Sequence, residues 1–207
     1  MANFNFHDGK CYRAEDPLLG PDAYGGSVWG VLGDKLIAGG HYARVLVIPF
    51  GIGGSAIAQW LPDGNLHPIL ARAAQRVNER GLVPTHVLWH QGESDAGLGT
   101  SERAYFDRFT ALLASLRGYG IDAPVYPAIA TYCRYADPEV SHEHSPAQQA
   151  VRAAQARLPE LPGVRPGPDT DTIVGRENRH DNCHFNARGM QAHAQLWLQA
   201  IAPGEAG

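Results

Sequence analysis

This sequence lacks a strong excess of charge of one sign and long apolar runs, and it has few cysteines. Lysine and arginine total 17 against 21 aspartates and glutamates, so the net charge is −4, and no basic stretch could hold nucleic acid. The apolar runs are too short to span a bilayer, and residues 1–8 lack the basic and apolar regions of a signal peptide. The composition predicts a globular chain with neither nucleic acid nor a membrane as a partner.

The three cysteines, Cys11, Cys133 and Cys183, are odd in number and widely separated. Their spacing fits neither a disulfide framework nor a zinc site. We therefore expect reduced thiols, as in a cytoplasmic protein. The compartment stays open, because a missing N-terminal segment would take any secretion signal with it.

Apolar and amphipathic segments alternate along the chain in the order typical of an α/β protein. Residues 43–50 form a continuous apolar run bounded by glycines, which predicts a strand buried on both faces. Further strands are predicted at 85–90, 124–131 and 172–174, helices at 27–38, 67–80, 101–117, 145–158 and 187–202, and irregular structure at 1–26. This order predicts a parallel sheet between two helical layers, in a single domain over residues 1–207.

Two polar clusters stand where this fold would place its chemistry. The first, Gln91 to Asp95, directly follows a predicted strand, at the carboxyl edge where α/β enzymes bind ligands. In the second, Asp181 precedes His184 by three residues across a turn, so the carboxylate can reach the imidazole Nδ1 and fix its tautomer. Together the clusters indicate a hydrolase of the Ser/His/Asp type.

Three groups could stabilise an oxyanion: the side-chain amide of Gln91 and the backbone N–H groups of Gly53 and Gly54. The alternative is that Gln91 makes ordinary loop hydrogen bonds and that the glycines form a turn with positive φ. Their positions after consecutive predicted strands favour a shared site.

The order of these motifs resembles the SGNH hydrolase superfamily, in particular its sialate O-acetylesterase and acetylxylan-esterase-like branch. The resemblance covers essentially the whole chain and rests on Gly53-Gly54-Ser55, Trp89-His90-Gln91-Gly92-Glu93-Ser94-Asp95 and Asp181-Asn182-Cys183-His184-Phe185. It implies a flavodoxin-like three-layer α/β/α fold and the removal of acetyl groups from sugar hydroxyls, with no cofactor and no metal.

The resemblance also implies residue roles. His184 would be the general base and Asp181 its orienting partner. Gln91 would supply the side-chain donor of the oxyanion hole, and Gly53, or the neighbouring Gly54, a backbone N–H. Glu93 and Ser94 would support the loop behind Gln91, and the substrate would be an acetylated carbohydrate.

The sequence departs from the family at the nucleophile. In the family the reactive serine follows a first strand, in a Gly-Asp-Ser or Gly-Gln-Ser-Asn block, and the sequence has no such block. We therefore expect the domain to be N-terminally incomplete, without the first strand and its serine. An absent strand would leave its neighbours unpaired, which favours pairing of domains into a homo-oligomer.

Other interpretations remain. The chain could be an inactive, esterase-derived carbohydrate-binding module. Ser94, in an approximate Gly-x-Ser-x-Gly elbow, could serve as the nucleophile of an α/β-hydrolase-like esterase, and Ser55 is a weaker candidate. A metal could be held by His180, Asp181 and His184, or by the cluster His142-Glu143-His144. Tyr132 and Tyr135 are expected to line the acyl or sugar pocket.

Overall fold

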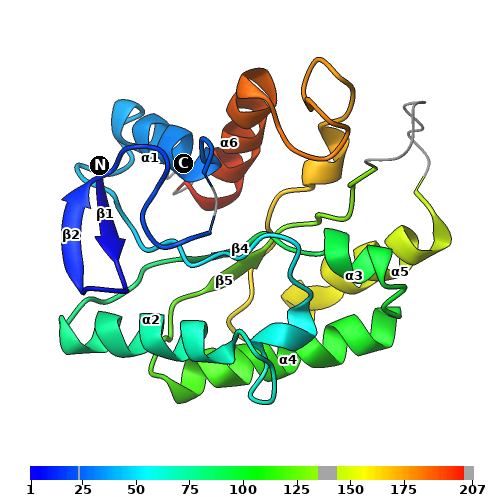
Figure 1. Cartoon of the computed structure of the whole chain (residues 1–207), viewed down its shortest axis with the longest axis horizontal. Coiled ribbons are helices and arrows are strands. Elements are labelled where there is room, and N and C mark those ends of the chain that lie inside the picture. Colours follow the sequence, from blue (N-terminus) through cyan, green and yellow to red (C-terminus); the bar gives the residue numbers. More distant parts are fainter. Residues whose placement is uncertain (23, 135–143, 203–207) are drawn as a thin grey trace, which may run out of the picture.

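The computed structural model describes residues 1–22, 24–134 and 144–202. Central strands run between two groups of helices, with α1 and α6 on one side and α2 and α4 on the other (Figure 1). The strands are β1 (Ala2–Asn5), β2 (Lys10–Arg13), β3 (Leu46–Val47), β4 (Val87–Trp89) and β5 (Val125–Pro127). The helices are α1 (Val28–Ala38), α2 (His67–Glu79), α3 (Glu93–Gly97), α4 (Glu102–Gly118), α5 (Pro146–Arg157) and α6 (Ala187–Ile201), and the 3-10 turns are η1 (Ile57–Trp60), η2 (Leu158–Glu160) and η3 (Thr170–Thr172).

All five predicted helices are confirmed, with ends that agree with the predicted ones to within a residue or two. Serine hydroxyls cap three of them: Ser27 accepts a hydrogen bond from Trp29 N–H, Ser101 from Ala104 N–H and Ser145 from Gln148 N–H. Such caps satisfy backbone donors that a first helical turn leaves open, and they fix where each helix begins.

The sheet consists of two hydrogen-bonded pieces, β2-β1-β3 and β4-β5. β1 runs parallel to β3 and β4 runs parallel to β5, while β1 and β2 form an antiparallel hairpin. Residues 164–169 continue the second piece through isolated parallel bridges to Val125 and Ile129. Among the described residues no ladder joins β3 to β4, so the central sheet is interrupted between them.

The two faces of the sheet pack against different helices, which gives the predicted three-layer arrangement. In β4, Val87 and Trp89 pack into the core cluster that holds the buried residues of α2, α4 and α5. Leu88 packs on the opposite side, against the cluster of α1 and α6 that includes the fully buried Trp197. This alternation follows from the two-residue period of a strand.

Three predictions about strands are wrong. Residues 1–26 contain the hairpin β1-β2, whose signal was the alternation of Phe4 and Phe6, each 1% exposed, with polar residues. Only Leu46–Val47 of the run 43–50 forms a strand, since β3 pairs with β1 on one edge alone, and Leu46 is exposed rather than buried. At 172–174 the chain leaves the 3-10 turn η3, since the Asp169 side chain accepts a hydrogen bond from Asp171 N–H and caps that turn.

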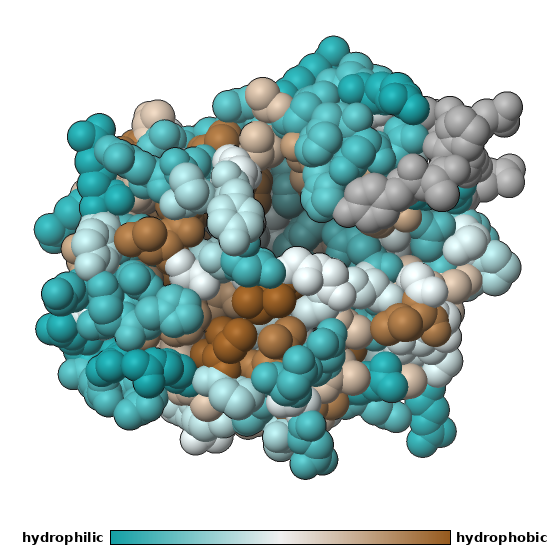
Figure 2. Space-filling view, in the orientation of Figure 1, coloured by the Kyte–Doolittle hydropathy of each residue, from teal (hydrophilic) through white to brown (hydrophobic). Residues whose placement is uncertain are grey.

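Apolar side chains come to the surface in the middle of the face shown in Figure 2, between the central strands and the helices α2 and α4. Partly buried Ile48, Phe50 and Ile52, from the segment after β3, pack against the core on the α2 and α4 side. Within the described residues, no helix combines the length and the apolar character needed to cross a bilayer.

Candidate active site

The loop before α6 brings Asp181 and His184 into direct contact. Asp181 Oδ2 lies 2.8 Å from His184 Nδ1, and Asp181 Oδ1 accepts hydrogen bonds from the backbone N–H groups of Cys183 and His184 at 3.0 and 2.7 Å. A carboxylate at Nδ1 favours the tautomer with its hydrogen there, which leaves Nε2 as the proton acceptor. The spacing of three residues thus produces the pairing that a general base requires.

The carboxyl group of Asp181 is held in its charged form. Partial burial opposes ionisation, but hydrogen bonds from the His184 side chain and from the backbone of His184 and Cys183 outweigh it and lower the pKa of Asp181 to about 2. At neutral pH the group is therefore an anion facing the imidazole, where it stabilises the imidazolium formed on proton transfer.

Arg179 anchors this loop, a role that was not predicted from the sequence. Its side chain is 3% exposed and donates hydrogen bonds to the backbone carbonyls of Ile173, Thr170, Tyr132 and Cys183. The guanidinium carbon also lies 4.0 Å from the centre of the Phe185 ring. Nothing in the local pattern around Arg179 signals this role, because its carbonyl partners come from three places in the chain: residues 170–173, Tyr132 and Cys183.

A disulfide joins Cys133 to Cys183, so the prediction of three reduced thiols is wrong. The two cysteines are 50 residues apart in sequence, and they meet because the segment after β5 lies against the loop before α6. Cys183 stands between Asp181 and His184, and the bridge therefore ties the candidate catalytic loop to the segment that follows β5. Cys11 is free and exposed.

Gln91 is not arranged as an oxyanion donor. Its Nε2 donates to the Ser55 carbonyl at 3.1 Å and to Asp95 Oδ2 at 2.7 Å, which uses both amide hydrogens. Its Oε1 accepts from the Tyr105 hydroxyl at 3.1 Å. The side chain is buried and links the loop after β4 to the loop before η1, so the alternative of a structural hydrogen-bonding role describes it better.

Asp95, rather than Glu93 or Ser94, supports Gln91. Asp95 is 0% exposed, and its carboxylate also accepts from Ile57 N–H at 2.7 Å and from the Thr100 hydroxyl at 2.8 Å. Glu93 instead lies 3.9 Å from His90 Nδ1. The last acidic residue of the Gln91–Asp95 block therefore organises the loop from inside the core.

In the turn formed by Gly53 and Gly54, one of the two backbone N–H groups already has a hydrogen-bond acceptor. Gly53 N–H donates to Asp22 Oδ1 at 3.0 Å, so a carboxylate already sits where the oxyanion was expected. Gly54 has φ +68°, the left-handed conformation that the turn interpretation requires. Of the two predicted backbone donors, Gly54 is the one without a hydrogen-bond acceptor among the described residues.

The described serines do not reach the base. The chain has seven serines, of which Ser141 lies outside the described residues. Ser55 donates to the Ile52 carbonyl and accepts from Trp60 Nε1, and Ser94 lies in the first turn of α3. Within the described part of the chain, no hydrogen bond joins His184 to Ser55 or Ser94, so the structure supports neither residue as the nucleophile.

The remaining predicted site residues have other surroundings. Tyr132 is 2% exposed and packs under Arg179, so it cannot present its ring to a ligand. Tyr135, His142 and Glu143 fall outside the described residues. His180 lies next to the pair, with its Nε2 at 3.6 Å from Asp181 Oδ2.

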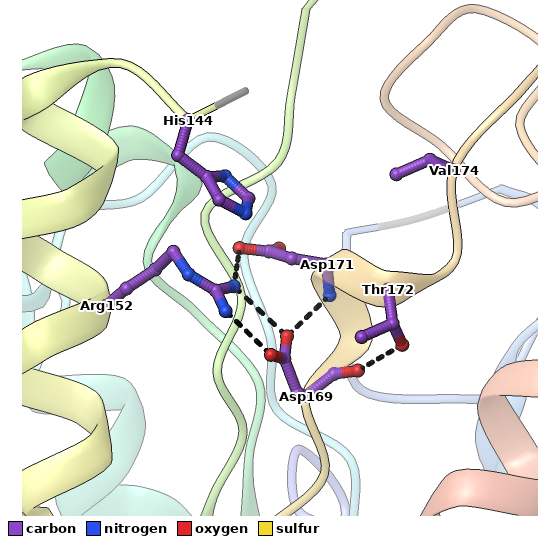
Figure 3. A pocket seen from close by; sticks show the side chains of 6 residues that line it. All are labelled: His144, Arg152, Asp169, Asp171, Thr172 and Val174. Carbon is purple, nitrogen blue, oxygen red and sulfur yellow. Dashed lines mark hydrogen bonds and ion pairs between the residues drawn. The ribbon is translucent and has the colours of Figure 1, made fainter. Parts of the chain in front are cut away.

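A cavity of about 240 Å³ lies near His144 (Figure 3). Arg152 points across it to Asp169 and Asp171, at 2.7 Å from each carboxylate. Asp171 also accepts hydrogen bonds from the backbone N–H groups of Thr131 and Tyr132 and from the Thr131 hydroxyl. The Arg152 guanidinium thus balances one of the two carboxylate charges, and the hydrogen bonds from Thr131 and Tyr132 to Asp171 hold the segment after β5 in place.

Comparison of the sequence with protein-family models gives a match over most of the chain. The sequence profile described as "Carbohydrate esterase, sialic acid-specific acetylesterase" matches residues 26–202. The chain belongs to this family. No curated protein sequence matches it.

Solved structures support the fold of this carbohydrate esterase family member. A protein from Arabidopsis thaliana superposes with a TM-score of 0.72 and 20% identity, over 95% of this chain and 77% of the other. A GDSL-like lipase, so described, from Parabacteroides merdae superposes with a TM-score of 0.63 and 16% identity, over 86% and 82%. The predicted SGNH-type α/β fold is therefore confirmed.

Proposed function

We propose that this carbohydrate esterase family member takes part in the hydrolysis of acetyl esters on sugar hydroxyls, with His184 as general base and Asp181 as its orienting partner. The observation that carries the proposal is the 2.8 Å contact between Asp181 Oδ2 and His184 Nδ1, on a loop where both groups remain accessible to solvent. Family membership supplies the reaction class.

In the proposed reaction a serine hydroxyl attacks the acetyl carbonyl carbon while His184 Nε2 takes its proton. The tetrahedral intermediate collapses, the sugar oxygen leaves with the proton from His184, and the acetyl group stays on the serine. Water then attacks this ester with His184 again as base, which releases acetate and restores the serine. The Gly54 N–H is the proposed backbone donor to the oxyanion.

The test is acetate release from O-acetylated sialic acid and acetylated xylan by the purified chain, with fluorophosphonate labelling to locate a reactive serine. His184→Ala should lower turnover by at least about 10³-fold, because a triad without its base loses most of its catalysis. His180→Ala is the matched control, since it removes a neighbouring exposed imidazole and leaves the hydrogen bond between Asp181 and His184 intact.

A second candidate is a module that binds acetylated glycans without turnover; it is favoured by the Ser55 hydroxyl, which bonds Ile52 and Trp60, and by the position of Ser94 in the first turn of α3. Saturable binding of an acetylated sugar, with neither acetate release nor serine labelling in a folded chain, would establish this module and contradict the esterase proposal. A label on Ser94 or Ser55 would instead show a nucleophile that the present geometry does not support.

A further inference from the structure

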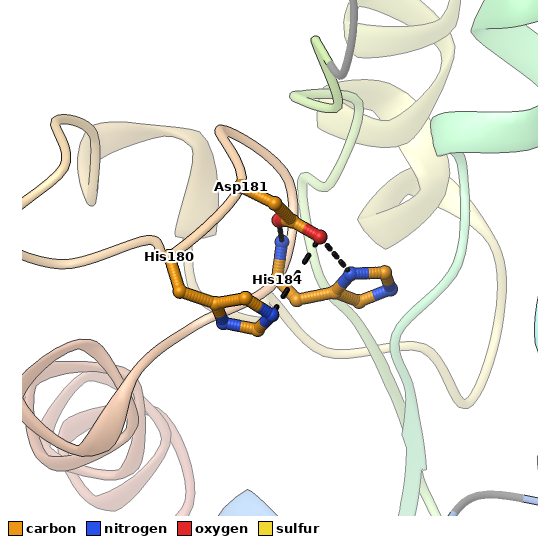
Figure 4. A group of neighbouring side chains, drawn as sticks. All are labelled: His180, Asp181 and His184. Carbon is orange, nitrogen blue, oxygen red and sulfur yellow. Dashed lines mark hydrogen bonds and ion pairs between the residues drawn. The ribbon is translucent and has the colours of Figure 1, made fainter.

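Beside the Asp181–His184 pair stands a third metal-ligating side chain that the proposed reaction does not use. His180 and His184 stack with ring centres 5.8 Å apart and planes inclined by 19°, and both face the Asp181 carboxylate (Figure 4). One nitrogen of each imidazole and one carboxylate oxygen all lie within 4.8 Å of one another. The three residues therefore present a His-Asp-His ligand set on one loop.

The distances suit a small divalent ion. Zinc binds imidazole nitrogen and carboxylate oxygen at about 2 Å, so two ligand atoms in a tetrahedral shell lie about 3.3 Å apart. Asp181 Oδ2 lies 2.8 Å from His184 Nδ1 and 3.6 Å from His180 Nε2, which brackets that separation. The His180 side chain is 60% exposed, so its ring can move the short distance that brings its nitrogen to the same separation from the His184 nitrogen.

We propose that His180, Asp181 and His184 form a binding site for Zn²⁺ and similar divalent transition-metal ions, and that such an ion switches the base off. Imidazole nitrogen with carboxylate oxygen is a donor set that these ions prefer, whereas Ca²⁺ and Mg²⁺ prefer oxygen alone. Three protein ligands would leave a fourth position for water.

The loss of base function follows from which nitrogen is taken. A metal at His184 Nδ1 replaces the hydrogen that Nδ1 shares with Asp181. The neutral ring then carries its hydrogen on Nε2, so Nε2 has no lone pair to accept the serine proton. The ion thus inhibits rather than assists hydrolysis; this consequence rests on the proposed function, whereas the binding site itself rests only on the geometry.

The first experiment measures binding without reference to activity. Co²⁺ is titrated into the purified chain and followed by its visible absorption, and Zn²⁺ binding is followed by calorimetry. We expect one ion per chain, and binding at least about tenfold weaker in His180→Ala, because one of three protein ligands is lost. His7→Ala is the control, since it removes an exposed imidazole outside the cluster.

Equal Zn²⁺ affinity in the parent chain and in His180→Ala, or no binding at all, would overturn the site. The nitrogen is identified by ¹⁵N NMR of the His184 ring with bound Zn²⁺: a hydrogen on Nε2 supports the inhibitory mechanism, and a hydrogen on Nδ1 refutes it. Neither readout needs turnover, so an inactive chain contradicts the esterase proposal and leaves the metal site to be judged by its own data.

Discussion

At the scale of single residues, the candidate site depends on charges held in defined environments. Asp181 is charged because three donors converge on its oxygens, and Asp95 is buried because its acceptors are matched by surrounding donors. A buried or half-buried carboxylate of this kind stabilises the fold by accepting hydrogen bonds from buried donors. Removing the carboxylate leaves those donors without partners and lowers the free energy of unfolding.

We predict that Asp181 stays ionised down to pH about 2 and that His184→Ala raises its pKa toward the ordinary 3.8. Because the folded-state pKa lies below the ordinary value, ionisation of Asp181 stabilises the fold above pH about 3.8, and this contribution is lost as the pH falls toward 2. Carbon-13 NMR of the Asp181 carboxyl measures the titration. An unchanged pKa in His184→Ala would show that the backbone donors alone hold the charge.

Asp95→Ala is predicted to destabilise the protein by about 3 kcal/mol or more, because it leaves Ile57 N–H and the Gln91 amide buried without an acceptor. Asp107→Asn is the control: Asp107 is exposed and pairs with the exposed Arg103, so the expected change is below about 0.5 kcal/mol. Urea unfolding of both variants gives the two free energies. Similar values for them would contradict the organising role of Asp95.

At the scale of elements, the loops are fixed by close approaches and by a covalent link. Gly92 ends the run from β4 and precedes α3, in contact with the segment after β5. Cys183 connects the loop before α6 to the same segment. Both polar clusters are therefore held by one stretch of chain, residues 130–133.

Gly92→Ala is predicted to disrupt the junction of β4 and α3. A Cβ at this position would lie 2.2 Å from the Ala130 carbonyl oxygen, which belongs to backbone that cannot swing away. Gly97→Ala, at the last residue of α3, meets nothing within 4 Å and should be neutral or stabilising by up to about 1 kcal/mol. Thermal unfolding compares the two, and equal melting temperatures would refute the close approach.

Replacing Cys133 and Cys183 together by alanine is predicted to lower the free energy of unfolding by about 4 kcal/mol, as expected for opening a loop of 50 residues. Cys11→Ser should change nothing, because Cys11 is exposed and unpaired. Guanidinium unfolding with and without reductant provides the comparison. A parent chain whose stability does not respond to reductant would argue against the bridge.

At the scale of the whole molecule, the two faces of the interrupted sheet carry separate cores. The core beneath α1 and α6 contains a polar group, His193, which is 3% exposed and accepts a hydrogen bond from Trp197 Nε1 at 3.0 Å. Burial, together with the neighbouring His90 and Arg179, lowers the pKa of His193 well below 6.5. The fold therefore depends on an uncharged imidazole in its interior.

This burial predicts an acid-sensitive fold. Below pH about 6.5 the unfolded chain binds a proton at His193, whereas the folded chain keeps this imidazole neutral. The contribution of the neutral His193 to the free energy of unfolding is therefore complete above pH about 6.5 and decreases as the pH falls below that value. His193→Gln keeps an acceptor for Trp197 and should flatten the decline between pH 6.5 and 5. Unfolding free energies at several pH values test this, and an equal slope in the variant would assign the loss to other groups.

The sequence by itself determined the five longer helices, α1, α2, α4, α5 and α6, and the pairing of Asp181 with His184, whereas the short helix α3 was not predicted. Each of these depends on residues within one or two turns of one another, so periodicity and local spacing carry the information. It also determined the α/β class, because strands and helices alternate along the chain.

Only the tertiary structure decided the rest. Several contacts join segments far apart in sequence, which no local pattern encodes. Gln91 links Ser55 to Asp95 by donating a hydrogen bond to each, Arg179 donates to the Tyr132 carbonyl, and a disulfide joins Cys133 to Cys183. The extent of each strand was likewise set by its neighbours, as β3 shows with a ladder on one edge alone. Hydrogen-bond partners across a fold are fixed by where the chain brings them, and that is a property of the packed molecule.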